Sequence, residues 1–327
     1  MVSLFLDANI LLDFYRFGKD DIEEIKKLDT LIEEQEIKFY SNGLLEDEVN
    51  RARDAIVSKS FEEFKSANFQ VRPPSYCQDI EGLPELQEQL KQANKLHSKF
   101  VDRVLECIRD DDLAADTLIR NLFEKAQSIE LTQEIKDAAK FRLQVNNPPR
   151  KSKDSIADSI HWEALLSIKS GVDFHLVTRD GDFASDLEPE NIKDFLQNEW
   201  QHQHGSYSRI TLHTSLSSFF QSQFPSIKLS SVAKTNALVE RLVNSPNFAT
   251  THSVIAELSG IDKFTRRQVE SMFRALVENS QVGWIATDDD VKDFFLQLKD
   301  QAMWVPEEIQ QAAAEFLEVS EDFFFPF

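Results

Sequence analysis

The stretch Phe5-Leu6-Asp7-Ala8-Asn9-Ile10-Leu11-Leu12 decides the fold, because it places an acidic residue directly after a short apolar run. Residues 2–6 are apolar except for Ser3, which predicts a buried strand, and helix-like apolar spacing follows over residues 9–17. Further strands, with helices between them, are expected at residues 37–40, 173–178 and 209–212. This alternation predicts an α/β fold in which a central parallel sheet carries helices on both faces, an α/β/α arrangement of three layers.

Length and composition limit the classes of protein that fit. The chain has 327 residues, of which 41% are hydrophobic, so we expect one large domain or two. With only Cys77 and Cys107, the sequence lacks a disulfide framework. No apolar run approaches the ~20 residues that a membrane helix needs, and the first residues lack a signal-peptide pattern. We therefore expect a soluble, cytoplasmic protein without a membrane partner.

The net charge of −21 argues against broad, non-specific binding to nucleic acid. It does not argue against a nuclease, because a site that gathers metal ions needs carboxylates. In that case a local rim of basic residues must supply the phosphate contacts.

Composition and periodicity divide the chain further. Residues 83–145 have an almost entirely helical pattern, and Asn146-Asn147-Pro148-Pro149 interrupts it. We expect a domain at 1–224 with a helical insertion at about 64–147, and a small, mostly helical domain at 225–327. In the insertion, His97 belongs to an amphipathic stripe and is expected to be a core or rim residue rather than a metal ligand.

Acidic residues recur at the ends of predicted strands and near the starts of predicted helices. Each has an ordinary interpretation as a cap or turn residue. Jointly they are expected to converge on one edge of the sheet, where oxygen ligands would suit Mg²⁺ or Mn²⁺. Of Glu46 and Glu48, at most one should face a site shared with Asp7. The residues concerned are Asp7, Glu46, Glu48, Asp154, Asp158, Asp180 and Asp182.

These motifs resemble those of the PIN-domain nucleases, over roughly residues 1 to 215. The resemblance implies a Mg²⁺- or Mn²⁺-dependent endonuclease that acts on nucleic acid, most often RNA. The four matching segments, in family order, are Phe5-Leu6-Asp7-Ala8-Asn9-Ile10-Leu11-Leu12, Leu45-Glu46-Asp47-Glu48-Val49-Asn50-Arg51, Lys153-Asp154-Ser155-Ile156-Ala157-Asp158-Ser159-Ile160-His161-Trp162-Glu163, and Val177-Thr178-Arg179-Asp180-Gly181-Asp182-Phe183.

The resemblance also implies roles for individual residues. The catalytic, metal-binding acids would be Asp7, Glu48, Asp158 and Asp180, with Asp154 and Asp182 as further ligands at the rim. Asn9 and Thr178 would lie beside these acids and orient them. The basic residues expected to contact nucleic acid are Arg51, Arg53, Arg150, Lys151, Lys153 and Arg179.

Several alternatives remain open on the sequence alone. The chain could be a non-catalytic PIN-like scaffold that binds nucleic acid or protein, or a DNA-directed nuclease of the same fold. A haloacid-dehalogenase-type phosphatase would need an aspartate where this chain has Asn9, which argues against that class. The carboxyl-terminal domain could contain a helix-turn-helix whose second helix presents Arg266, Arg267 and Arg274 to a groove of nucleic acid. Its acidic composition instead favours a small helical domain that packs on the nuclease domain or forms a dimer contact. A homo-oligomer or a regulatory protein partner is also compatible with the sequence.

Overall fold

The computed structural model describes residues 1–16, 19–78, 80–149, 156–169, 173–225, 227 and 229–324. Arg150, Lys151, Lys153 and Asp154 lie outside the described residues. The chain divides into two compact units. The sheet unit consists of Leu4–Lys26 and Phe39–Leu216, and the helical unit consists of Met1–Ser3, Lys27–Lys38 and Ser217–Phe327.

A five-stranded parallel sheet forms the centre of the fold, as the alternating pattern predicts. Its order is β3-β2-β1-β4-β5. Strands β2 and β3 follow on one side of β1, and β4 and β5 follow on its other side. The order therefore reverses between β1 and β4, and ligands of open parallel sheets bind beyond the carboxyl ends of strands at such a point. The strands are β1 (Val2–Leu6), β2 (Ile37–Ser41), β3 (Gln127–Ser128), β4 (Phe174–Val177) and β5 (Ile210–His213).

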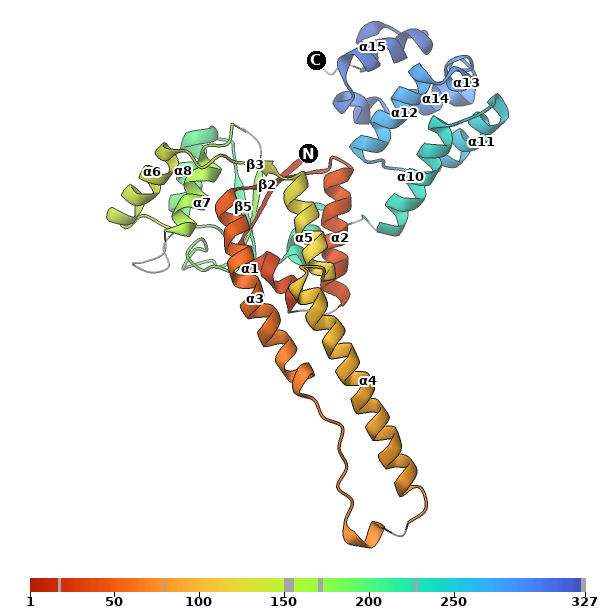
Figure 1. Cartoon of the computed structure of the whole chain (residues 1–327). Coiled ribbons are helices and arrows are strands. Elements are labelled where there is room, and N and C mark those ends of the chain that lie inside the picture. The colour runs from red at the N-terminus through yellow and green to blue at the C-terminus, as the bar shows by residue number, and fades with distance from the viewer. Residues whose placement is uncertain are drawn as a thin grey trace. The chain divides into compact units, whose positions relative to one another are not determined.

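Helices cover both faces of this sheet, with α6, α7 and α8 on one side and α3 and α5 on the other (Figure 1). Apolar and aromatic side chains fill the space beneath them: Trp200 packs against Trp162 and Phe174, with ring centroids 6.2 and 5.2 Å apart. The helices of this unit are α1 (Ala8–Leu11), η1 (Leu12–Tyr15), α3 (Gly43–Ser66), η2 (Ser75–Cys77), α4 (Leu83–Arg109), α5 (Ala114–Lys125), α6 (Gln133–Gln144), α7 (Ala157–Leu166) and α8 (Asp194–His204).

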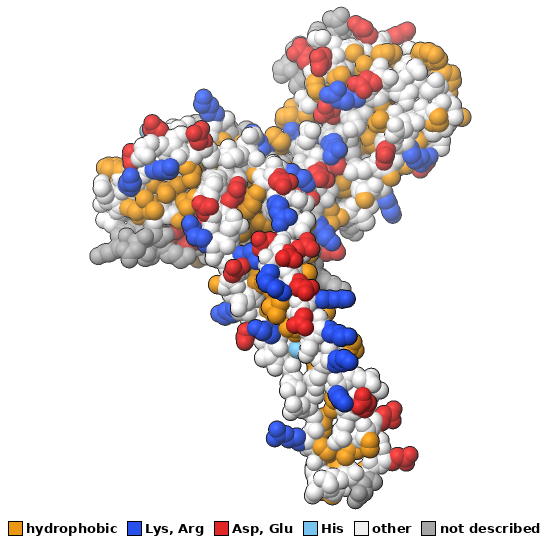
Figure 2. All heavy atoms as spheres, in the orientation of Figure 1, with side chains coloured by type: hydrophobic (Ala, Val, Ile, Leu, Met, Phe, Trp, Pro, Cys, Tyr) orange, Lys and Arg blue, Asp and Glu red, His pale blue; other side chains and the backbone are white. Residues whose placement is uncertain are grey.

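The carboxyl-terminal half of α3 and the whole of α4 lie side by side and extend away from the sheet (Figure 1). We call residues 53–109 the arm. His97 contributes to its packing, as expected: its ring lies against Phe64 and Phe69, and Nε2 lies 2.8 Å from the Phe64 carbonyl oxygen. Lys and Arg side chains follow one another along the α4 side of the arm (Figure 2).

The helical unit has its own core of apolar side chains. Phe273 packs edge-on against Phe295 and against Phe324, which is buried. The buried Glu34 accepts hydrogen bonds from Thr265 (2.5 Å) and Asn236 (2.7 Å) inside the same unit. Besides the part of α2 (Lys19–Glu33) from Lys27 onward and most of α9 (Leu216–Gln223), the unit contains α10 (Leu229–Val243), α11 (Phe248–Leu258), α12 (Arg266–Glu278), α13 (Ser280–Gly283), α14 (Asp289–Gln297), η3 (Lys299–Trp304), α15 (Glu307–Phe316) and η4 (Glu321–Phe324).

The tail does form the two helices and the turn that the sequence predicts, as α11 and α12. However, α12 buries six of its thirteen residues in the helical unit. Arg266 stacks over the Trp304 ring at 3.6 Å and Arg274 pairs with Glu270 at 2.8 Å. A helix that is committed to packing in this way fits a structural domain better than a DNA-recognition helix.

One local feature differs from the expectations. The segment predicted as a helical insertion contains β3, which pairs in parallel with β2 and so belongs to the sheet. Among the described residues, no helix is long and apolar enough to cross a membrane.

Candidate functional site

Asp7 lies at the switch point of the sheet, directly after β1. Its backbone N–H donates to the Val177 carbonyl oxygen (3.0 Å) at the end of the neighbouring strand β4, and its own carbonyl begins α1. Its side chain does not cap that helix. Instead Oδ2 accepts hydrogen bonds from Asn9 Nδ2 and Thr178 Oγ1, each 2.5 Å long. Asn9 and Thr178 therefore hold the Asp7 carboxylate in place.

The loop after β4 brings a second acid to this point. Thr178 Oγ1 also accepts a hydrogen bond from the Asp180 backbone N–H (2.9 Å), which ties this loop to Asp7 through one hydroxyl group. Asp180 Oδ1 in turn accepts from the Asp182 backbone N–H (3.0 Å). The side chain of Asp180 is buried, and Asp182 is half-buried beside it.

A chain of hydrogen bonds orients the third acid, Glu48. Asn42 caps α3 by accepting a hydrogen bond from the Leu45 backbone N–H on Oδ1 (3.0 Å), so its Nδ2 must face the other way. Asn42 Nδ2 lies 3.1 Å from His161 Nδ1, and His161 Nε2 lies 2.9 Å from Glu48 Oε2. Because an amide nitrogen can only donate, Nδ1 accepts and the hydrogen of the neutral imidazole is on Nε2. His161 therefore donates to Glu48.

The surroundings of Asp7 disfavour its charged form. Burial raises the pKa of Asp7 above its ordinary value, and the hydrogen bond from Thr178 lowers it. The charge of His161 also lowers the pKa of Asp7, whereas the charges of Glu48 and Asp180 raise it. The pKa of Asp7 thus responds to two of the other three acids that were expected to converge with it.

The fourth acid, Asp158, lies in the first turn of α7 and is half-buried. His161 is three residues further along the same helix, so the two side chains share a helix face. Glu46, unlike Glu48, accepts a hydrogen bond from Ser41 (3.4 Å). Among the residues that the structure describes, no three His, Cys, Asp or Glu side chains are arranged closely enough to hold a metal ion.

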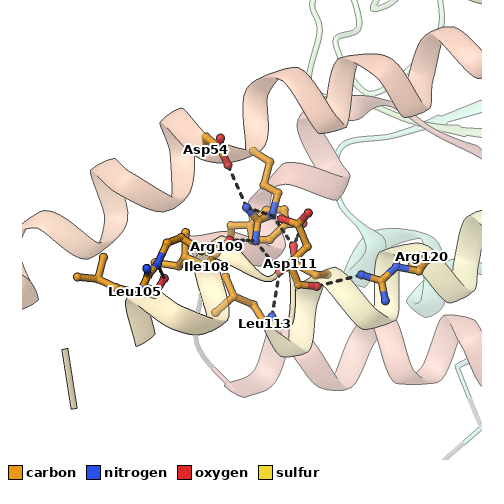
Figure 3. Close-up of polar contacts among 10 residues, drawn as sticks. Asp54, Leu105, Ile108, Arg109, Asp111, Leu113 and Arg120 are labelled. Atoms are coloured by element: carbon orange, nitrogen blue, oxygen red, sulfur yellow. Dashed lines mark hydrogen bonds and ion pairs between the residues drawn. The ribbon is translucent and has the colours of Figure 1, made fainter. Parts of the chain in front are cut away.

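Arg53, expected to contact nucleic acid, is buried in the structure. Its guanidinium group bonds both oxygens of the buried Asp116 at 2.7 Å, and it also pairs with Asp54 (3.0 Å) and Asp111 (2.9 Å) (Figure 3). Burial raises the pKa of Asp116, but hydrogen bonds from Arg53 and Tyr15 outweigh it and hold the pKa below its ordinary value. Because this network satisfies its charge, we do not retain Arg53 as a nucleic-acid ligand.

The other basic residues expected at the rim are less constrained. Arg51, two residues from Arg53 on α3, is exposed. Arg179 is partly exposed; it pairs with Asp13 and donates to the Asn9 carbonyl oxygen (3.0 Å). Arg51 follows Glu48 by three residues, and Arg179 directly precedes Asp180.

Sequence reasoning did not assign a role to His161 or Asn42. A signal for His161 was its spacing of three from Asp158, which places both on one face of α7. Asn42 has the sequence signature of a helix cap, but its second contact is with a residue 119 positions away. No local pattern reports such a contact.

The fold and the site together define an α/β protein with an acidic site at the switch point of a parallel sheet. A family model described as a PIN domain matches residues 4–183, and the chain belongs to this PIN-domain family. Searches of curated proteins and of solved structures gave no match to this chain.

Proposed function

We propose that this protein is a metal-dependent endonuclease that hydrolyses phosphodiester bonds, with RNA as its substrate. The observation that carries the proposal is the fixed position of Asp7 at the switch point, where Asn9 and Thr178 hold its carboxylate and Thr178 also binds the backbone of Asp180. Membership of the PIN-domain family supports the same activity, because nuclease activity is general in that family.

The chemistry of the donor set fits a divalent cation such as Mg²⁺ or Mn²⁺. Hard cations prefer carboxylate oxygens, and crowded carboxylates repel one another when no cation compensates them. Asp7, Glu48, Asp158 and Asp180 would hold the ion, with Asp182 and Asp154 as further candidates. A cation at this site would activate water and neutralise charge on the scissile phosphate.

The remaining residues prepare this carboxylate set. Asn9 and Thr178 fix the Asp7 carboxylate, and His161 fixes Glu48 by donating from Nε2. Donors of this kind keep ligands oriented and add to their affinity for metal. Arg51 and Arg179, at the rim, would bind phosphates that flank the scissile bond.

A non-catalytic binding protein is the second candidate. It is favoured by the finding that, within the described part of the chain, no three ligand side chains already surround one point. Nucleic acid would then bind at the same edge of the sheet without being cleaved.

The proposal is tested by incubating the protein with Mn²⁺ and single-stranded RNA, tRNA, single-stranded DNA or flap DNA, followed by gel analysis. We expect cleavage of RNA by the wild type and none by Asp158→Asn. Binding without cleavage of any of the four substrates would support the non-catalytic alternative. Cleavage of DNA alone would reassign the substrate.

A further inference from the structure

The outer face of α4 carries a stripe of basic residues at a constant spacing of four: Lys91, Lys95, Lys99 and Arg103. All four are exposed. The segment 89–101 contains three lysines and no acidic residue, although the whole chain has 57 Asp and Glu against 36 Lys and Arg. We call these four residues the basic stripe.

The basic stripe does not serve the packing of the arm. Side chains at other positions of α4 make the contacts with residues 64–69. The Asn94 side chain accepts a hydrogen bond from the Phe69 backbone N–H and donates one to the Phe69 carbonyl oxygen, and His97 contacts Phe64. Among the described residues, no ion pair forms with Lys95, Lys99 or Arg103, and Lys91 reaches only Glu88 at 3.9 Å. Like charges four apart disfavour a helix, so these three successive pairs do not stabilise the arm.

The arm is joined firmly to the candidate active site. Helix α3 carries Glu48 near its start and continues into the arm as far as Ser66. At the root of the arm Arg53 bonds Asp116, Asp111 and the Ile108 carbonyl oxygen, which fixes α3 to the end of α4 (Figure 3). These contacts should therefore hold the basic stripe at a fixed position relative to Glu48.

Helix geometry gives the reach of this arrangement. At 1.5 Å per residue, the basic stripe is about 18 Å long, and Phe64, which packs against its middle turns, is about 24 Å from Glu48 along α3. A stacked strand advances about 3.4 Å per nucleotide. A strand that ran from the site along the arm would thus reach the stripe several nucleotides away from the scissile bond.

We propose that the basic stripe binds the phosphate backbone of the substrate strand away from the cleavage point, and that the arm selects long substrates over short ones. This inference rests on the proposed nuclease function. Phosphate is the partner that fits, because a row of four cations at regular spacing matches a regular row of anions.

The test compares two variants of the full chain with the same change in charge. The stripe variant is Lys91→Gln, Lys95→Gln, Lys99→Gln and Arg103→Gln, since glutamine keeps the helix propensity. The control is Lys136→Gln, Lys140→Gln, Lys234→Gln and Lys263→Gln, all exposed and outside residues 53–109. Fluorescence anisotropy in EDTA measures affinity for a labelled 30-nucleotide RNA and its DNA counterpart at several salt concentrations. Cleavage in Mn²⁺ is measured on the 30-mer and on a tetranucleotide, which spans only about 14 Å.

We expect the stripe variant to bind both 30-mers at least tenfold more weakly. The slope of log affinity against log salt concentration should become shallower by about 3, because each of the four lost phosphate contacts contributes roughly 0.7. Cleavage of the tetranucleotide should be unchanged, and the control should match the wild type within twofold. A stripe variant that equals the control would overturn the inference while leaving a cleaving wild type as support for the proposed function. A wild type that neither binds nor cleaves nucleic acid would overturn both. A shift from dimer to monomer in sedimentation, with RNA affinity intact, would make the stripe an interface between copies instead.

Discussion

His161 Nε2 donates a hydrogen bond to Glu48 Oε2 over 2.9 Å, and so links α7 to α3 across the carboxyl edge of the sheet. Asn42 settles the direction of this bond by donating to Nδ1. One ring thus connects two of the family's acidic motifs. Its role is to orient a carboxylate, and this role is open to a direct test.

Replacement of His161 should weaken the site without removing an acid. His161→Ala leaves Glu48 without its donor, and loss of such a donor typically costs 10- to 100-fold in metal affinity or activity. His161→Gln retains one donor and one acceptor, so it should recover part of the loss. The measurements are Mn²⁺ affinity by calorimetry and the rate of RNA cleavage. Equal behaviour of the wild type and the alanine variant would show that the ring is only a packing residue.

Asp7→Asn should abolish cleavage and leave the metal-free protein as stable as the wild type or more so. The physical reason is the raised pKa of Asp7: the folded state disfavours the carboxylate, so the stability that this group contributes is lost as pH rises through its folded pKa. Thermal unfolding with and without Mn²⁺ checks this. The wild type should gain about 2.7 kcal/mol at a Mn²⁺ concentration of 100 Kd. A similar gain in the variant would remove Asp7 from the ligand set.

Arg51 and Arg53 offer a matched pair of substitutions on α3. Arg53→Met should destabilise the protein by about 3–5 kcal/mol, because it leaves the buried Asp116 without the cation that pairs with it. Arg51→Met, at an exposed position, should change stability by less than about 0.5 kcal/mol and instead weaken RNA binding. Urea denaturation and anisotropy separate the two effects. The reverse result would restore Arg53 as an RNA ligand.

The pair formed by His175 and His213 should make the protein sensitive to acid. Burial lowers the pKa of each to about 4, and the two rings contact at 2.9 Å between Nδ1 and Nε2. As the pH falls from 6.5 to about 4, these histidines become protonated in the unfolded chain but stay neutral in the folded protein. The free energy of unfolding therefore falls over this window. The loss is at most about 3 kcal/mol for each ring.

Denaturation of the wild type and of His175→Phe with His213→Phe at pH 7 and pH 4.5 checks this prediction. The double variant retains a ring pair but has no group to protonate, so it should lose less stability on acidification. Equal losses in the two proteins would assign the acid sensitivity to other groups.

The main outline of the fold could be predicted from the sequence because it depends on local patterns. Apolar runs that end in Asp7 or shortly before Asp180 mark strands, and parallel order then brings their carboxyl ends to one edge. Strand β3 was not predicted, because it consists of two exposed residues and so has no periodic pattern. Its place in the sheet depends on pairing with Tyr40 and Ser41, far away in the sequence.

The same limit explains which site residues were missed or misassigned. Arg53 looked like a phosphate ligand because it follows Glu48 closely, but the partner that buries it, Asp116, is 63 positions further along. His161 was visible only as part of a motif. Its function as a donor depends on Asn42 and Glu48 from another helix, and such tertiary contacts leave no trace in local spacing.

The most direct test of the central claim compares Glu48→Gln with Asp47→Asn in Mn²⁺-dependent cleavage of single-stranded RNA. Both variants remove one negative charge from neighbouring positions of α3, but Glu48 faces the site whereas Asp47 is exposed. We predict that Glu48→Gln loses activity by at least 100-fold, which corresponds to about 2.7 kcal/mol of transition-state stabilisation, and that Asp47→Asn retains the wild-type rate. Wild-type turnover by Glu48→Gln, or an equal loss in both variants, would contradict the assignment of these carboxylates to the active site.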